Sequence, residues 1–423
     1  MSRRGRGARV RRLILLAILL TLVLQPAQPG RALQGAHGLQ GGWAIDDEGQ
    51  VTFAQSTSAQ LPLMRGAGAG WVRINFRLGA CYRDWTSIGC NGRTALDAYD
   101  DIVAAAEREG LQVLGLIANE SWPGDPAQWV ENNAETTAGN GDNDYLRAFS
   151  LAAAVPLVQH FRGRITTWEV WNEPNAYTTQ TGAGHYGGGT FIYPSNLAWL
   201  LRHVYEDTRR AGGPGARFIS GGLLSHDDSG VPVELAAALA HGILKPRPLL
   251  ALGSGEQPDN RPDGLDLTFD PSGALYLQAT YRYGRALAGW DQIEARYGSY
   301  PLDGIGQHLY IDQGSATSRE RISANLQSVR AAYEAFEGRQ TAKQIYITEF
   351  GWQTSAVTHR LQAANLQIAC DTFGSLPYVA QAYWTGIQDV AAASLYFGLV
   401  DADGSLKPAY RAYQLAATET AAR

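Results

Sequence analysis

The chain has 423 residues and a formal net charge of −5 at pH 7, and no long run of one charge sign occurs beyond its first residues. This balance gives no reason to expect a nucleic-acid partner or an anionic surface. Beyond the N-terminal segment described next, about 390 residues remain, enough for two domains or for one large α/β barrel, so length alone leaves both open.

Residues 1–32 are typical of a secretory signal peptide. A basic stretch from Arg3 to Arg12 precedes an apolar block from Leu13 to Leu24, which is followed by small residues. The apolar block is too short to span a bilayer, because a membrane-spanning helix needs roughly 20 residues. We therefore expect cleavage near Ala27 or Ala32, an extracellular protein, and no membrane anchor after cleavage.

Short β-rich runs then alternate with helical stretches, which is typical of βα units around a parallel sheet. Eight strands are predicted: Gly41–Ile45, Gly70–Phe76, Gln112–Ala118, Ile165–Trp171, Arg217–Gly221, Gly304–Tyr310, Gln344–Glu349 and Val379–Trp384. Helices are predicted at Ala95–Glu109, Asp144–His160, Ser195–Ala211, Tyr276–Tyr297, Ser318–Phe336, Leu361–Ser375 and Pro408–Ala417. Eight strands with intervening helices predict a (β/α)8 TIM barrel that forms a single domain over residues 38–420.

The regular spacing breaks once, between the fifth and sixth strands. Residues Gly253 to Gly273 in this interval are rich in Gly, Pro and Asp, which indicates an irregular loop. The sequence therefore predicts an insertion in the barrel at this point.

The cysteines fall into two groups. Cys81 and Cys90 flank a loop-like stretch, CYRDWTSIGC, and in an exported protein this favours a disulfide between them. Cys370 ends an apolar helical run, LQAANLQIAC, where we expect a buried, unreactive thiol.

Two predicted strands end in a glutamate. In the run TWEVWNEPN, Pro174 forces the chain out of the strand ladder directly after Glu173, so the carboxyl is presented at the rim. The neighbouring Asn172 can both donate and accept hydrogen bonds, which suits a sugar hydroxyl. In the run QIYITEFGW, Glu349 follows an apolar strand in the same way. Because the carboxyl ends of barrel strands face one site, we expect the two glutamates to converge.

These residues resemble the clan A glycoside hydrolases, whose barrels carry an Asn-Glu pair after strand four and a nucleophilic Glu after strand seven. The resemblance extends to Arg73 in WVRINF, to His308 and Tyr310 in GQHLY, and to Trp384 in AYWTGIQD. The closing run GLVDADGSLKPAYRAY is similar to the ends of cellulase-like family 5 and xylosidase-like family 39 barrels, so the resemblance covers about residues 40–417. Two features depart from these families: LIANESWP lacks a histidine common in family 5, and no accessory β-sandwich is recognisable.

The resemblance implies retaining hydrolysis of β-glycosidic bonds in poly- or oligosaccharides, with Glu349 as nucleophile and Glu173 as general acid/base. It assigns substrate binding, or contact with the carboxylates, to Arg73, Asn172, His308, Tyr310 and Trp384. We expect a carbohydrate partner, no cofactor, no metal and a monomeric protein.

Two alternatives remain open at this point. A transglycosylase would use the same two glutamates and transfer the glycosyl group to a sugar instead of water. A non-catalytic carbohydrate-binding barrel is also compatible with the fold, although it would be expected to have lost a glutamate or its supporting Arg, His or Tyr. Taken alone, a glutamate at a strand end is often a solvated rim residue. For Glu120, a contact with the sugar and a solvated loop acid both remain open.

Overall fold

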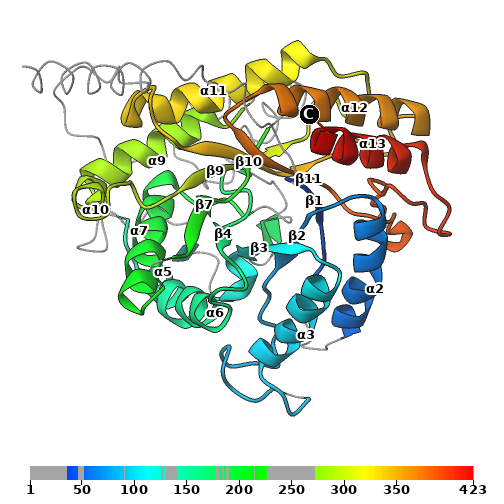
Figure 1. Cartoon of the computed structure of the whole chain (residues 1–423). Coiled ribbons are helices and arrows are strands. Elements are labelled where there is room, and N and C mark those ends of the chain that lie inside the picture. Colours follow the sequence, from blue (N-terminus) through cyan, green and yellow to red (C-terminus); the bar gives the residue numbers. More distant parts are fainter. Residues whose placement is uncertain are drawn as a thin grey trace, which may run out of the picture.

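A computed structural model describes most of the chain: residues 36–45, 52–89, 91–124, 128–129, 141–176, 181–182, 185–186, 190–213, 215–225 and 272–422. In this part, parallel strands form a closed barrel with helices around it (Figure 1). The strand order is β10-β11-β1-β2-β3-β4-β7-β9, and a further pairing of β9 with β10 closes the ring. The predicted (β/α)8 barrel is confirmed.

The barrel strands match the predicted set closely. They are β1 His37–Gln40, β2 Trp71–Asn75, β3 Gln112–Ile117, β4 Thr167–Val170, β7 Arg217–Ser220, β9 Gly304–Leu309, β10 Gln344–Phe350 and β11 Val379–Trp384. The two-residue strand β8, Leu223–Leu224, follows the fifth barrel strand, β7, after a short break and pairs with β9. A separate small hairpin pairs β5 Thr181–Gly182 with β6 His185–Tyr186.

Helices cover the outside of the barrel. They are α2 Thr52–Gly66, α3 Ala95–Arg108, α5 Asp144–Phe149, α6 Val155–His160, α7 Pro194–Arg210, α9 Ala274–Ala286, α10 Trp290–Tyr297, α11 Arg319–Glu337, α12 His359–Ser375 and α13 Pro408–Ala422. Short 3-10 turns occur at Asn119–Ser121 and Ala391–Ala393, and a π-helical turn, Ser150–Ala154, joins α5 to α6. Among the described residues, no helix combines the length and the apolar character that a membrane crossing requires.

Three elements differ from the prediction. The first strand is His37–Gln40 and not Gly41–Ile45, because His37 to Gln40 are the residues that pair with β11 and β2. Ala44 and Ile45, which follow, lie in a loop and are buried. The single helix predicted at Tyr276–Tyr297 is two helices, since Gly289 adopts a φ of +64° where the second one begins. Helix α2 was not predicted at all.

Some expectations lie outside the described residues. These are the signal peptide, Cys90 and most of the predicted insertion, residues 226–271. They stay predictions.

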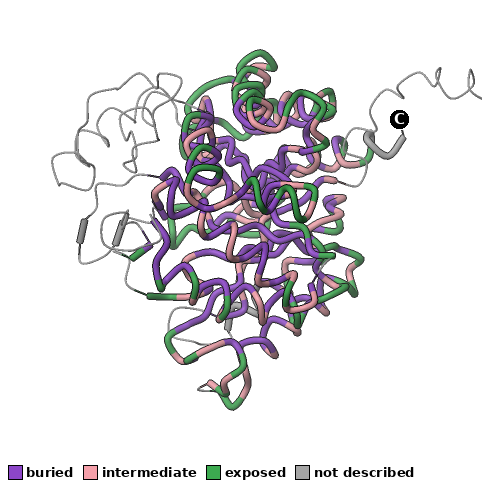
Figure 2. Tube along the Cα trace, turned by 90° about the vertical axis from the view of Figure 1, so that its left-hand side faces the viewer, coloured by how far each residue is buried: buried purple, intermediate pink, exposed green. Residues whose placement is uncertain are grey.

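The apolar core has two parts. The larger part lies between strands and helices, where Phe76 stacks on Tyr99 with ring centroids 4.6 Å apart. A smaller cluster, Leu114, Ile219, Tyr346 and Tyr383, comes from β3, β7, β10 and β11. Buried residues accordingly fill the interior, and exposed ones lie on the outer helices and loops (Figure 2). The rigid frame positions the strand ends that carry the candidate site.

Candidate active site

The end of β4 leaves the regular strand geometry where its functional residues begin. Trp171 and Glu173 both have positive φ angles, 77° and 43°, a conformation that costs most non-glycine residues roughly 1–3 kcal/mol. Thr190 holds this turn, because its hydroxyl donates to the carbonyl oxygens of Asn172 and Glu173. The indole of Trp171 packs against aromatic residues of α5, while Asn172 turns toward the guanidinium of Arg73.

A second irregularity places Glu349. The register of β10 against β9 shifts between Ile347 and Glu349, so the regular alternation of side chains is interrupted there. As a result, two consecutive side chains point into the barrel: Thr348 donates to Glu169, and Glu349 accepts from Arg73. Bulges of this kind re-aim side chains next to active sites.

Glu349 accepts hydrogen bonds on both carboxylate oxygens. Arg73 Nη1 and Gln40 Nε2 donate to Oε1 at 2.6 and 3.2 Å, and the hydroxyl of Tyr310 donates to Oε2 at 2.6 Å. Burial opposes the charge of Glu349, but the positive charges of His308 and Arg73 outweigh it and lower the pKa of this carboxyl below its ordinary value. Glu349 is therefore held as a carboxylate.

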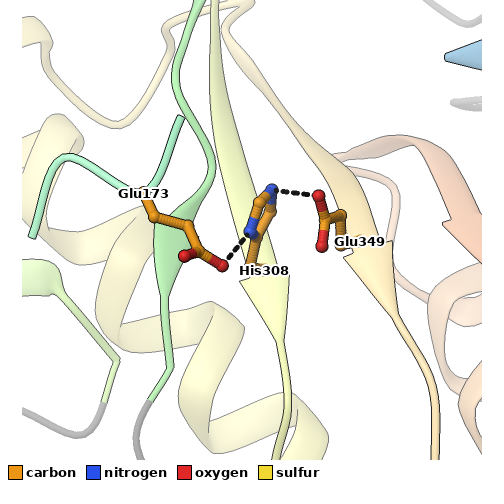
Figure 3. A group of neighbouring side chains, drawn as sticks. All are labelled: Glu173, His308 and Glu349. Carbon is orange, nitrogen blue, oxygen red and sulfur yellow. Dashed lines mark hydrogen bonds and ion pairs between the residues drawn. The ribbon is translucent and has the colours of Figure 1, made fainter. Parts of the chain in front are cut away.

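His308 lies between the two glutamates (Figure 3). Its Nδ1 forms a 2.9 Å hydrogen bond with Glu173 Oε1, and its Nε2 lies 3.6 Å from Glu349 Oε1, an ion-pair distance. Burial disfavours a charged imidazole, yet the negative charge of Glu349 and the bond to Glu173 raise the pKa of His308 above its ordinary value. One oxygen of each glutamate and a ring nitrogen of His308 all lie within 4.8 Å of one another.

Beneath this group lies a carboxylate that the sequence reading missed. Glu169 is fully buried, and its Oε2 accepts a 2.6 Å hydrogen bond from Arg73 Nε. Arg73 thus contacts three partners, since its Nη2 also donates to Asn172 Oδ1 at 2.9 Å. A charged residue in the middle of an apolar strand was the available signal for Glu169.

Of the residues predicted to form the site, the structure brings together Arg73, Asn172, Glu173, His308, Tyr310 and Glu349. Trp384 lies differently: it is fully buried, its Nε1 donates to the carbonyl oxygen of Phe397, and its ring packs against Phe350. It presents no accessible surface to a ligand here, and its role as the floor of the sugar site stays a prediction. Phe397 is half-buried and contacts the ring of Tyr310, 5.5 Å between centroids.

Two of the three cysteines, Cys81 and Cys370, lie in the described residues, and both agree with the prediction. Cys81 is disulfide-bonded, and its predicted partner Cys90 lies outside the described residues. Cys370 is a free, buried thiol whose pKa is raised by burial, as expected for an unreactive cysteine.

A polar group borders the site at the ends of β1, β2 and β3. Glu120 accepts a 2.6 Å hydrogen bond from Asn75 and pairs with Arg77 at 3.1 Å. The guanidinium carbon of Arg77 lies 4.6 Å from the ring centroid of Trp43. The side chain of Glu120 is 37% exposed, so it is open to a ligand.

The three residues Glu173, His308 and Glu349 also have the composition of a metal site, the one such group among the described residues. A cation bound there would face the guanidinium of Arg73, which already donates to Glu349 Oε1 at 2.6 Å. The positive charge of this guanidinium would repel a bound cation.

No family model and no curated protein matches the chain. Several solved structures match the chain over most of its length. A GH5_18 structure from Streptomyces cattleya in complex with GlcNAc is 15% identical, with a TM-score of 0.55, and the match covers 92% of this chain and 81% of that one. A GH5_18 variant from Bifidobacterium longum in complex with Manβ1-4GlcNAc is 13% identical, with a TM-score of 0.54 and coverages of 90% and 78%. The virulence factor SghA with its substrate analog salicin is 13% identical, with a TM-score of 0.53 and coverages of 91% and 96%. The chain therefore shares the barrel fold of these structures.

Proposed function

We propose that this protein is a retaining glycoside hydrolase in which Glu349 is the nucleophile and Glu173 is the general acid/base. The observation that carries the proposal is the approach of the two carboxylates, whose nearest oxygens lie within 4.8 Å. Retaining enzymes hold their carboxyl groups about 5–5.5 Å apart, whereas inverting enzymes need about 6.5–9.5 Å to fit a water molecule between carboxylate and sugar.

In the first step, the ionised Glu349 attacks the anomeric carbon while the bond to the glycosidic oxygen breaks. Glu173 gives its proton to that oxygen, so the leaving group departs as a neutral alcohol. His308 occupies Oε1 of Glu173, which leaves Oε2 to carry the proton and face the leaving group.

In the second step, water attacks the anomeric carbon of the glycosyl-enzyme. Glu173, now a carboxylate, removes a proton from this water, and the ester bond to Glu349 breaks. The released carboxylate regains its hydrogen bonds from Arg73 and Tyr310, which favours turnover over accumulation of the ester.

We further propose that the substrate is a β-linked glycoside outside the cell. The related structures carry a β-linked disaccharide or a salicin ligand, and the N-terminal segment has the pattern of an export signal. Glu120 with Asn75 and Arg77 supplies acceptors and donors at the rim that suit sugar hydroxyls.

The test is turnover of a panel of aryl β-glycosides and oligosaccharides by wild type, Glu173→Ala and Glu349→Ala. Both variants should lose at least about 1,000-fold in kcat with the fold intact, whereas Glu320→Ala, on the exposed face of α11, should match wild type. Azide should rescue Glu349→Ala with an inverted glycosyl azide as product. Full activity of Glu349→Ala would contradict the assignment.

Two alternatives give different results in the same assay. A transglycosylase would convert an added sugar acceptor faster than it releases free sugar. A binding barrel would bind oligosaccharides in calorimetry and turn over none of them.

A further inference from the structure

Glu169 is a buried carboxylate that the proposed reaction does not use. It is fully buried, and it accepts three hydrogen bonds: from Arg73 Nε at 2.6 Å, from the backbone nitrogen of Gly222 at 2.9 Å and from Thr348 Oγ1 at 2.9 Å. With all these partners and no exposed surface, it cannot touch a substrate. It meets the site through Arg73, and its Oε1 also lies 3.9 Å from His308 Nε2.

Arg73 is shared between two carboxylates, one of which changes charge during catalysis. Its Nε faces Glu169 and its Nη1 faces Glu349, both at 2.6 Å. In the glycosyl-enzyme, Glu349 is an ester and carries no charge. The proton given up by Glu173 leaves a new carboxylate, but that one is bonded to His308, and no contact joins it to Arg73.

We propose that Glu169 is the permanent counter-ion of Arg73, a positioning residue that keeps the guanidinium paired and oriented while the charge of Glu349 is consumed. This inference rests on the proposed function, because the change of charge on Glu349 belongs to the retaining mechanism.

The physical reason is the cost of an unpaired charge inside the barrel. Arg73 is only 2% exposed, and a buried ion whose partner is removed is strongly destabilising. With Glu169 in place, Arg73 has a carboxylate partner in the free enzyme and in the glycosyl-enzyme alike. The bond at Nε also fixes the plane of the guanidinium, so that Nη1 and Nη2 reach Glu349 and Asn172.

The first experiment is the pH profile of kcat/KM for Glu169→Gln, which keeps the shape of the side chain and removes its charge. The acidic limb of this profile follows the ionisation of Glu349. Five ionisable groups face Glu349 or its partner Arg73. Glu169 lies in β4 and Glu173 just after it, His308 lies in β9 and Tyr310 just after it, and Tyr383 lies in β11.

Without the negative charge of Glu169, the whole charge of Arg73 acts on Glu349. The acidic limb should then move to lower pH by about one unit, and kcat/KM at the optimum should fall about 10- to 100-fold. If Glu169 served only as packing, the glutamine, which has the same shape, would leave Arg73 in place and the limb would not move. The control is Thr348→Val, which removes a neutral donor to Glu169 and should leave the limb in place.

The second experiment does not depend on activity. Glu349→Gln imitates the uncharged ester, so the double variant with Glu169→Gln leaves Arg73 without a carboxylate partner. The urea midpoint of this double variant should fall by more than the sum of the falls in the two single variants. Glu337→Gln, which neutralises a separate buried pair with Lys343, should combine additively with Glu349→Gln.

Additive behaviour of the first pair, or an acidic limb that stays or moves to higher pH, would overturn the counter-ion role. If wild type hydrolyses no glycoside, the proposed function fails, and the urea cycle still decides whether Glu169 is the partner of Arg73.

Discussion

The two oxygens of the proposed nucleophile have chemically different partners. Oε1 faces the cation Arg73, whereas Oε2 accepts a hydrogen bond from the neutral hydroxyl of Tyr310 at 2.6 Å. Burial and the negative charge of Glu349 raise the pKa of Tyr310 well above its ordinary value, so the hydroxyl keeps its proton and remains a donor. Tyr310 therefore stabilises the carboxylate form of Glu349 without adding charge.

Tyr310→Phe removes this donor and leaves the ring. Hydrogen bonds to charged groups contribute about 1.5–3 kcal/mol, so the pKa of Glu349 should rise by about one unit or more. We expect the acidic limb of kcat/KM to move to higher pH, opposite in direction to the shift for Glu169→Gln. Thr385→Val, which removes the other hydroxyl bonded to Tyr310 at 2.7 Å, is the control and should leave the limb within a few tenths of a unit. An unshifted limb in Tyr310→Phe would contradict the role.

At the scale of elements, the break between β7 and β8 allows the backbone to lie close to His308. Between β7 and β8, the backbone nitrogen of Gly222 donates to Glu169, and a Cβ at this residue would lie 2.0 Å from His308 Cδ2. Only glycine allows the backbone to approach the imidazole so closely. The break in the strand and the position of His308 are therefore coupled.

Gly222→Ala should displace His308 and loosen its hydrogen bond to Glu173. We expect kcat/KM to fall at least about 10-fold and the unfolding free energy to fall by about 1–3 kcal/mol, the usual cost of overpacking. Gly215→Ala, just before β7, is the matched control, because a Cβ there meets nothing within 4 Å. Steady-state kinetics and urea denaturation of both variants check this, and equal activity of the two would disprove the coupling.

At the scale of the whole molecule, the barrel followed from the alternation of strand and helix runs, and the two glutamates followed from their position at strand ends. What the sequence did not reveal are local departures from regular geometry. The bulge beside Thr348 and the left-handed backbone at Trp171 decide which side chains face inward. Both involve contacts distant in sequence: Thr348 donates to Glu169, and Thr190 donates to the carbonyl oxygens of Asn172 and Glu173. Glu169 was missed because its partners lie far away in the sequence: Arg73 is in β2, and Gly222 is in the break between β7 and β8.

The barrel is closed by segments near the two ends of the described chain. β1 pairs with both β2 and β11, and the last helix, α13, packs against α12. Tyr413 of α13 joins them, since it is fully buried, its hydroxyl donates to the carbonyl oxygen of Gly38 at 2.8 Å, and its ring meets His37 edge-on. The position of the first strand therefore depends on the last helix.

Tyr413→Ala should lower the unfolding free energy by about 3–5 kcal/mol, because it opens a cavity between α13 and β1. Tyr413→Phe, which loses only the hydrogen bond, should cost about 1 kcal/mol. Leu415→Ala lies on the same helix, but its side chain is 37% exposed, so it should cost clearly less than Tyr413→Ala. Urea denaturation followed by circular dichroism gives all three values. Equal losses for Tyr413→Ala and Leu415→Ala would mean that α13 stabilises the barrel in some way other than through β1.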